Sequence, residues 1–420
     1  MTEYDIAIVG AGAAGMAAAI AAGEAASGSR LRIVIIEGAR KPGAKILVSG
    51  GGRCNVTNQV VSPKDFWGGP RPTIRKVLGA FDVHHTIEWF RQLGVRLKLE
   101  PDGKYFPVTD NAQTVLDARL ERVATLGIQL LPSTRVTRLT PRSDHFEIGL
   151  SQGSPISARR VIIATGGLAL PKSGSDGAGM SMLQRLGHTV VPTTPALAPL
   201  ILGKSPDLGG RFSEFSGASM EVRLRLRRNR RVIAELTGAL LFTHFGVSGP
   251  VAMNLSRHWL RARLADERAA LQVTMGSPAL SSTEAADHWL IQQAAKHPRQ
   301  HLATILATLF PDRFAKALAA ELGDARTLAH LTREERLRLA GMLSDLPLPV
   351  TGTRDYSHAE ATAGGVDLHE IDPRRMQSRK IPGLYLCGEI LDVDGRIGGF
   401  NFQWAWSSGH VAGWAAVERD

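Results

Sequence analysis

The hydrophobic pattern of the first forty residues predicts a strand, a helix and a second strand. An apolar run at residues 6–9 precedes a glycine-containing turn at 10–15, and an alanine-rich stretch follows to residue 26. A second apolar run at 31–36 ends on Glu37. Short, continuous apolar runs are typical of strands that are buried on both faces of a parallel sheet. The pattern therefore predicts a βαβ unit at the start of the chain.

The turn of this βαβ unit has the glycine spacing of a dinucleotide-binding site. The first glycine permits the tight turn, the second lets backbone approach a pyrophosphate, and the third lets the helix pack closely on the strand. Free N–H groups at the helix start favour a phosphate, and Glu37 is placed to accept hydrogen bonds from a ribose. The candidate residues of the turn are Gly10, Ala11, Gly12, Ala14 and Gly15.

Alternating helical and strand patterns continue to residue 192. They predict helices at 73–93, 111–126 and 180–186, a hairpin at 95–99 and 105–108, a β-meander at 135–139, 146–150 and 156–158, and an apolar strand at 160–163. Thr165 and Gly166 follow that last strand. Because ligands of open α/β sheets lie at the carboxyl ends of the strands, both residues are candidates for the same site.

The middle of the chain changes its pattern twice. Residues 220–256 alternate as strands do, and residues 283–345 have the helical period. We therefore expect an inserted domain, β-rich over 193–282 and helical over 283–346, within a discontinuous α/β domain of residues 1–192 and 347–420.

The C-terminal part returns to the α/β pattern. An apolar strand ends at Gly388 and Glu389, with Asp394 behind it. A glycine pair at 398–399 then opens a helix that runs to residue 416. Glycines at a helix N-terminus present free N–H groups, which suit a pyrimidine carbonyl or a phosphate.

Three successive glycines at 50–52 are costly to order, since glycine loses the most backbone entropy on folding. The sequence S-G-G-G-R-C-N at 49–55 makes sense if backbone lies against a flat ligand, with Arg53 and Asn55 supplying donors. A mobile loop is the alternative. Cys54 could be a redox thiol, but without a neighbouring cysteine motif a small packed residue is favoured.

Composition indicates an ordinary globular protein with an excess of positive charge. The chain has 420 residues, of which 44% are hydrophobic and 21% charged, with a formal net charge of +11. This length suggests two or three domains. Arginines at 223, 225 and 227 give one predicted strand a basic face. We interpret it as a solvated edge, while RNA or a cofactor phosphate stays an alternative.

The number and spacing of the cysteines and the hydropathy of the chain limit where in the cell we expect the protein. The two cysteines, Cys54 and Cys387, have no metal-ligand spacing, and no apolar run reaches about eighteen residues. We therefore expect a cytoplasmic protein without a membrane span and without a metal site.

Two stretches carry a resemblance to a known family. Residues 43–58 and 362–409, including S-G-G-G-R-C-N, C-G-E-I-L-D-V-D-G and G-G-F-N-F-Q-W-A-W, resemble the HI0933-like bacterial flavoproteins. The segment T-H-F-G-V-S-G-P at 243–250 is similar to the insert of that family. The resemblance covers essentially the whole chain. It implies a two-dinucleotide-binding-type FAD protein in a family in which some members reduce dehydro-bile acids. The implied fold is α/β, a Rossmann-like FAD domain built from both chain ends and interrupted by an insert of β-barrel-like and helical parts.

The resemblance also implies roles for individual residues. Glu37 would hold the adenosine ribose, and Val136 would offer backbone near the adenine. The flavin side would be lined by Lys45, Ser49, Gly50, Gly51, Arg53, Cys54 and Asn55, the ribityl and pyrophosphate by Gly388, Glu389 and Asp394, and the isoalloxazine by Gly399, Phe400 and Asn401. Phe400 stands where the family has tyrosine, which removes a hydroxyl and keeps the ring.

We expect an oxidoreductase in which NAD(P)H reduces FAD, and flavin N5 passes hydride to a small apolar enone in a pocket between insert and flavin. Candidates for the proton donor or for carbonyl polarisation are His244, Arg354, Tyr356 and His358. Two alternatives stay open: an FAD-dependent tRNA-modifying enzyme, which the charge favours, and a flavin-bound regulator without turnover. Nucleic acid is not the expected partner, although the charge leaves it open.

Overall fold

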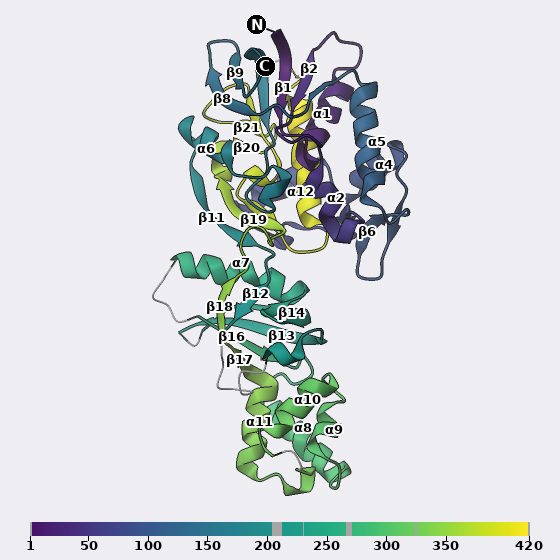
Figure 1. Cartoon of the computed structure of the whole chain (residues 1–420), viewed down its shortest axis with the longest axis vertical. Helices are drawn as coiled ribbons and strands as arrows, with labels where there is room; N and C mark the ends of the chain where they lie inside the picture. The colour runs from purple at the N-terminus through teal and green to yellow at the C-terminus, as the bar shows by residue number, and fades with distance from the viewer. Residues whose placement is uncertain (1, 204–211, 230, 266–270, 324–325, 419–420) are drawn as a thin grey trace. The chain divides into compact units, whose positions relative to one another are not determined.

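The computed structural model describes residues 2–203, 212–229, 231–265, 271–323 and 326–418 (Figure 1). The chain forms two compact units, residues 1–194 with 360–420 and residues 195–359, which we call the first and second unit. The second unit extends past the expected boundary at residue 346. Two strands, β17 (Leu346–Leu348) and β18 (Val350–Thr353), pair with β16 (Leu271–Gly276) and β12 (Leu200–Leu202) of the second unit, which keeps residues 347–359 there.

A parallel sheet forms the centre of the first unit. Its parallel strands run in the order β22 (Leu384–Leu386), β10 (Ile156–Ile163), β1 (Thr2–Val9), β2 (Ile33–Ile36) and β7 (Gln129–Leu131). Val9 pairs with Ile163 and Ile36, and Ile163 pairs with Leu386. The residues that follow these strands therefore meet at one edge of the sheet, the carboxyl edge.

Short antiparallel strands extend this sheet. β20 (Ile371–Asp372) and β21 (Gln377–Ser378) add to β22, while β8 (Val136–Pro141) and β9 (Phe146–Leu150) add to the start of β10. The third meander strand and the apolar strand, which the sequence divided at residue 159, are one strand. The predicted division was wrong because Ile156, which pairs with Ile148 of the meander, also pairs with Thr2 of β1. The pairing with β1 then continues to Ile163 in the same strand.

The two ends of the chain meet in a helix pair. Helix α1 (Ala13–Ala25) packs against α12 (Phe400–Ala415), seen as the purple and yellow helices in Figure 1. A Cβ on Gly409 would lie 2.5 Å from the Ala14 carbonyl oxygen, and one on Gly413 would lie 2.1 Å from that of Ala18. Such close approach needs glycine on one helix and alanine on the other.

The remaining elements of the first unit surround this pair and the sheet. Its helices are α2 (Ala44–Val48), α3 (Arg71–Ala80), α4 (Val83–Gln92), α5 (Ala112–Thr125) and α6 (Ala178–Arg185). Its short strands are β3 (Thr57–Asn58), β4 (Phe66–Gly68), β5 (Leu97–Leu99), β6 (Lys104–Pro107), β11 (Val190–Ala196), β19 (Ala361–Val366) and β23 (Val393–Gly395). The predicted hairpin is confirmed as β5–β6, and the predicted helices at 111–126 and 180–186 as α5 and α6.

The single helix predicted at 73–93 is wrong, since α3 and α4 divide at Phe81 and Asp82. Asp82 is the N-cap of α4, and its carboxylate accepts a hydrogen bond from the backbone N–H of His85. An N-cap residue has extended backbone, so the helix cannot run through it.

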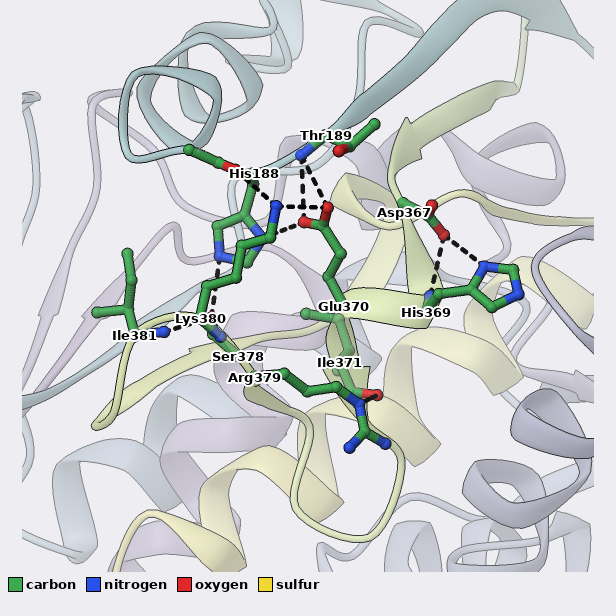
Figure 2. Close-up of polar contacts among 11 residues, drawn as sticks. His188, Thr189, Asp367, His369, Glu370, Ile371, Ser378, Arg379, Lys380 and Ile381 are labelled. Carbon is green, nitrogen blue, oxygen red and sulfur yellow. Dashed lines mark hydrogen bonds and ion pairs between the residues drawn. The ribbon is translucent and has the colours of Figure 1, made fainter.

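A buried polar network fastens the β20–β21 hairpin to the segment before β11 (Figure 2). His188 Nδ1 donates to Glu370 Oε2 at 2.8 Å, and Lys380 Nζ lies 2.6 Å from Glu370 Oε1. Ser378 Oγ lies 3.0 Å from His188 Nε2, which gives the connectivity of a serine hydrolase triad. The Ser378 hydroxyl is buried, however, and accepts from the backbone N–H groups of Lys380 and Ile381. The network is therefore structural.

The second unit contains an antiparallel sheet and a group of helices. The strand order is β17-β16-β13-β14-β15-β12-β18, with β13 (Ser219–Arg228), β14 (Arg231–Thr243) and β15 (Gly246–Ser248) in the middle. The outermost strands β17 and β18 are separated only by Pro349. Leu348 and Val350 are two residue steps apart, at most about 7 Å, so the sheet has to curl until these edges approach, which confirms the barrel-like expectation.

Helices cover and extend this sheet. They are α7 (Pro250–Ala265), α8 (Thr283–Lys296), α9 (Leu302–Leu306), α10 (Asp312–Ala320) and α11 (Arg333–Asp345). The helical pattern over 283–345 is confirmed, but the strand pattern assigned to 250–256 is wrong. Pro250 begins α7 there, and proline is favoured at the first position of a helix.

Arg223, Arg225 and Arg227 do not form the solvated basic face that the sequence suggested. Arg225 Nε pairs with Glu235 at 2.7 Å, and Arg227 Nη1 pairs with Asp345 at 2.5 Å. Arg223 donates to backbone carbonyls of residues 280 and 281. The face is therefore largely neutralised by contacts within the second unit.

Across the described ranges, no helix is both long and apolar enough to cross a membrane. In the same part of the chain, no group of three or more histidine, cysteine, aspartate or glutamate residues could hold a metal ion.

Candidate functional site

The glycine turn after β1 lies at the carboxyl edge of the sheet. A Cβ on Gly10, whose φ is +105°, would lie 2.6 Å from the Ala164 carbonyl oxygen, and one on Gly15 would lie 1.9 Å from that of Gly10. Both glycines are therefore required by packing. A Cβ on Gly12 would have no neighbour within 4 Å. Open space above Gly12, at the start of α1, leaves room for a phosphate group near free N–H groups.

Glu37 follows β2 at the same edge and is held by backbone. Its Oε2 accepts from Ala11 N–H and its Oε1 from Ala39 N–H, both at 2.7 Å. Each carboxylate oxygen keeps a further lone pair for a ligand hydroxyl. The Glu37 carbonyl accepts from Thr134 N–H at 2.8 Å, which places the buried Val136 two residues from this contact.

Lys45 and Glu389 meet near the ends of β10 and β22. Lys45 Nζ lies 2.8 Å from Glu389 Oε2. Glu389 Oε1 and Thr165 Oγ1 are buried without a hydrogen-bond partner in the described part of the chain. Buried polar atoms of this kind are normally satisfied, so a polar ligand in this region fits both. Gly166 is left-handed, with a φ of +74°, and turns the chain after Thr165.

The glycine loop has an ordered left-handed path. Gly50, Gly51 and Gly52 have φ values of +56°, +69° and +84°, and Cys54 follows with +62°. The first of these glycines follows Ser49, whose carbonyl accepts from Cys54 N–H at 3.0 Å. Cys54 is fully buried, and burial raises the pKa of its thiol to about 11. A thiol of this kind is protonated at neutral pH, which fits a packed residue.

Arg53 is held by the β5–β6 hairpin region. Its Nη1 lies 2.6 Å from Glu100 Oε1 and 3.5 Å from Asp110 Oδ1. Its guanidinium carbon lies 3.9 Å from the centre of the Phe106 ring. These contacts use Nη1 of Arg53 and hold the loop on the hairpin region. Contact of Arg53 with a ligand stays a prediction.

Side-chain amides join the glycine loop to the start of α12. The Asn55 amide accepts from Gly399 N–H and donates to the Thr57 carbonyl, both at 3.0 Å. Asn401 bridges the backbone of Gly395, accepting from its N–H at 2.8 Å and donating to its carbonyl at 3.0 Å. The Asn55 amide therefore holds the α12 N-terminus against the glycine loop, and Asn401 holds it against β23.

Three further predicted contact residues lie in the packing beneath this region. Asp394 is fully buried in β23, opposite Trp67 of β4. Phe400 is buried, with its ring centre 6.1 Å from that of Phe66 in an edge-to-face arrangement. Gly388 has a φ of +79°, and a Cβ there would lie 2.7 Å from Ala14 Cβ.

Sequence reasoning gave no role to several residues that shape this edge. Trp404 Nε1 donates to the Gly388 carbonyl at 3.1 Å, and Ser408 Oγ accepts from Gly388 N–H at 2.9 Å. Thr362 Oγ1 accepts from the backbone N–H groups of residues 168 and 169. Trp404 and Ser408 are one helical turn apart and therefore lie on one face of α12, and this spacing could have indicated a shared contact.

The four candidates for proton transfer belong to the second unit. His244 and Arg354 both approach Phe245, at 5.1 Å between ring centres and 5.0 Å from guanidinium carbon to ring centre. His358 Nδ1 lies 3.2 Å from Asp355 Oδ1. Tyr356 is half-buried close by in the sequence. The structure therefore brings His244 and Arg354 to one aromatic side chain.

The residues at the carboxyl edge fit FAD. The space above Gly12 suits a pyrophosphate, Glu37 suits a ribose, and the buried acceptor at Glu389 suits a ligand hydroxyl. A rigid glycine backbone beside the α12 N-terminus suits the flat ring system.

Comparison with known proteins agrees with this assignment. The family model of the HI0933-like protein Rossmann domain matches residues 4–415. A ribosomal RNA dihydrouridine synthase of Escherichia coli (strain K12) is 32% identical over 420 residues, covering 100% of this chain and 98% of that protein. A 3-dehydro-bile acid delta(4,6)-reductase of Clostridium scindens is 32% identical over 417 residues, covering 99% of each.

A solved quinol-fumarate reductase with menaquinol molecules has the same fold, with a TM-score of 0.52 at 17% identity, covering 100% of this chain and 71% of that one. The resemblance drawn from the two glycine-rich stretches is confirmed. The chain belongs to the HI0933-like family of FAD-dependent oxidoreductases.

Proposed function

We propose that this protein reduces a carbon–carbon double bond conjugated to a carbonyl, and that its substrate is a uracil base in RNA. The names of the two relatives support one shared reaction. Dihydrouridine differs from uridine by two hydrogens across a double bond conjugated to a ring carbonyl. A 3-dehydro bile acid with delta(4,6) double bonds has the same conjugation to its ketone.

Charge favours RNA between these two substrate classes. The chain is 32% identical to each of the two relatives, so sequence similarity alone does not choose between the two substrate classes. The net charge of +11 favours a polyanionic partner, because phosphate contacts provide most nucleic-acid affinity. On the sequence alone, a small enone is the expected substrate and RNA the alternative, and we now propose the reverse order. The small enone is our second candidate, supported by the Clostridium scindens relative.

FAD, when bound, supplies the hydride acceptance and donation, and we propose NAD(P)H as its electron source. The chain's own part begins with binding: the turn at Gly12 would hold the pyrophosphate and Glu37 a ribose. The hydrogen bond from Gly399 N–H to the Asn55 amide joins the glycine loop to α12, so that the backbone of the loop and the backbone at the start of α12 are fixed relative to each other. Fixed backbone of this kind orients a reactive group at little entropic cost.

Addition of hydride to one carbon of the double bond requires a proton at the other. We propose that an acid of the second unit supplies it, from the group His244, Tyr356 and His358. Arg354 would polarise the substrate carbonyl, since its guanidinium lies over the Phe245 ring and carries several N–H donors that suit an oxygen acceptor. Replacing the correct acid should slow substrate reduction and leave flavin reduction by NAD(P)H unchanged.

The test uses the purified holoprotein reduced under anaerobic conditions. It is mixed with ribosomal RNA transcribed in vitro or with a 3-dehydro-delta(4,6) bile acid, and flavin reoxidation is followed by absorbance. Mass spectrometry of nucleosides then detects the two added hydrogens. We expect reoxidation and dihydrouridine with RNA. Reoxidation by the bile acid alone would establish the second candidate, and reoxidation by neither would refute both.

A further inference from the structure

Helix α3 presents an acid-free basic face. Its sequence, R-P-T-I-R-K-V-L-G-A, contains three cations and no acid. Arg71, Arg75 and Lys76 are exposed, and within the described ranges none of them has an acidic partner at ion-pair distance. The buried side, Ile74 and Val77 among others, faces the core of the first unit. The three cations are therefore available to an external anion.

Trp414 adds an exposed aromatic ring in the last turn of the neighbouring helix α12. Its exposed fraction is 47%, whereas Trp404 and Trp406 of the same helix are buried. Its ring centre lies 6.0 Å from that of His410, with 22° between the ring planes. Burial and the nearby charge of His85 lower the pKa of His410 to about 4, so His410 is a neutral stacking partner at physiological pH.

Phe81 connects these two features. It follows α3 directly and stacks on His410, with 4.4 Å between ring centres and 26° between planes. Its carbonyl oxygen accepts from Gln403 Nε2 at 3.0 Å and from Ser407 Oγ at 2.6 Å. The end of α3 is therefore fixed to α12. We call Arg71, Arg75, Lys76 and Trp414 the α3–α12 surface.

Other basic stretches of the chain lack this combination. In β13, Arg225 and Arg227 are paired with Glu235 and Asp345, and Arg223 donates to backbone carbonyls. In the first unit, Arg91 of α4 is paired with Glu88 at 2.6 Å. Unpaired cations and an exposed aromatic ring, here on two helices that Phe81 joins, are the groups with which proteins bind single-stranded nucleic acid, the cations on phosphates and the ring against a base.

We propose that the α3–α12 surface binds a single-stranded segment of RNA, with its phosphates on Arg71, Arg75 and Lys76 and a base stacked on Trp414. Trp414 is separate from the flavin site, because α12 begins at Gly399 and Trp414 lies about 22 Å further along its axis at 1.5 Å per residue. The α3–α12 surface would bind the RNA substrate at a distance from the base that is reduced. The proposal rests on the proposed function for its class of partner.

Fluorescence anisotropy with a labelled single-stranded uridine-rich RNA tests the surface on the full-length holoprotein. The variant Arg71→Gln/Arg75→Gln/Lys76→Gln should bind more weakly and lower the slope of log affinity against log salt by about 2, since each single-strand phosphate contact contributes about 0.7. Trp414→Ala should weaken binding about 5- to 100-fold, and Trp414→Phe should restore most of it. Arg91→Gln is the matched control and should bind as the parent does.

The outcomes separate this surface from the proposed reaction. If both variant sets bind RNA as the parent does, the surface is refuted, even where the parent reduces uracil. A loss in the glutamine variant alone would refute the stacking role of Trp414. Should RNA binding depend on these residues while no base is reduced, the surface stands and the proposed function fails. A parent that binds no RNA at low salt refutes both.

Discussion

The close packing of α1 on α12 predicts that Gly413→Ala destabilises the first unit. In most helices this change is favourable by about 1 kcal/mol, because alanine has the higher helix propensity. Here the added Cβ would lie 2.1 Å from the Ala18 carbonyl oxygen, against about 3.4 Å for an ordinary contact. The two helices therefore have to separate by more than 1 Å, or one of them has to deform.

The size of the effect follows from these two opposing contributions. Overpacking of a well-packed core costs about 1–3 kcal/mol, and a clash with backbone belongs at the upper end of this range. After the gain in helix propensity, we expect a net loss of about 2 kcal/mol. For a domain of this size, 1 kcal/mol corresponds to about 2–4 °C, so the melting temperature should fall by about 4–8 °C.

Thermal unfolding followed by circular dichroism measures this change, and Gly79→Ala is the matched control. Gly79 lies in α3 of the same unit, and a Cβ there would have no neighbour within 4 Å. The control should be neutral or stabilising by about 0.5–1 kcal/mol. Because both helices begin at the flavin site, Gly413→Ala should also release FAD at a lower temperature, seen as a rise in flavin fluorescence. If Gly413→Ala is as stable as Gly79→Ala, the packing argument is refuted.

Three further changes test other parts of the first unit. Burial would raise the pKa of Glu370, but hydrogen bonds from Lys380, Thr189 and His188 outweigh it and hold this pKa at about 2. Its stabilising effect, about 3 kcal/mol, is therefore present above pH 4.5 and lost towards pH 2, so in thermal melts Glu370→Gln should lower stability at pH 7 and flatten the acid limb. Glu389→Gln, which removes the charge facing Lys45 Nζ, should weaken FAD binding about tenfold in a fluorescence titration, whereas unchanged affinity would place Glu389 outside the cofactor site. Because burial raises the pKa of the Cys54 thiol to about 11, iodoacetamide at pH 8 should label it only after unfolding, and rapid labelling of the native protein would contradict its packed position.

The parts of the fold that the sequence predicts are those fixed by local chemistry. The strands β1 and β2 follow from continuous apolar runs, and their register places Gly10 and Glu37 at one edge without further information. The N-cap at Asp82 escaped detection, because the apolar positions on either side keep one helical period across the break. A local cap changed the structure without changing the hydrophobic pattern.

Ion pairs could not be predicted, because the partners are far apart in the sequence. Arg227 is neutralised by Asp345, more than a hundred residues away, and a strand that reads as basic is therefore not a basic surface. Arg53 likewise points to Glu100 of the β5–β6 hairpin region, although its position beside three glycines suggested a ligand. In both cases the residue type was informative and its partner came only from the tertiary structure.

The arrangement of the cofactor site gives each end of the chain a separate task. The N-terminal βαβ unit supplies the dinucleotide turn and Glu37, while the C-terminal helix supplies the backbone at Gly399 and the contacts to Gly388. The close helix pair and the Asn55 amide couple these tasks within the first unit alone. The hydrogen bonds and close contacts named here all join residues of the first unit.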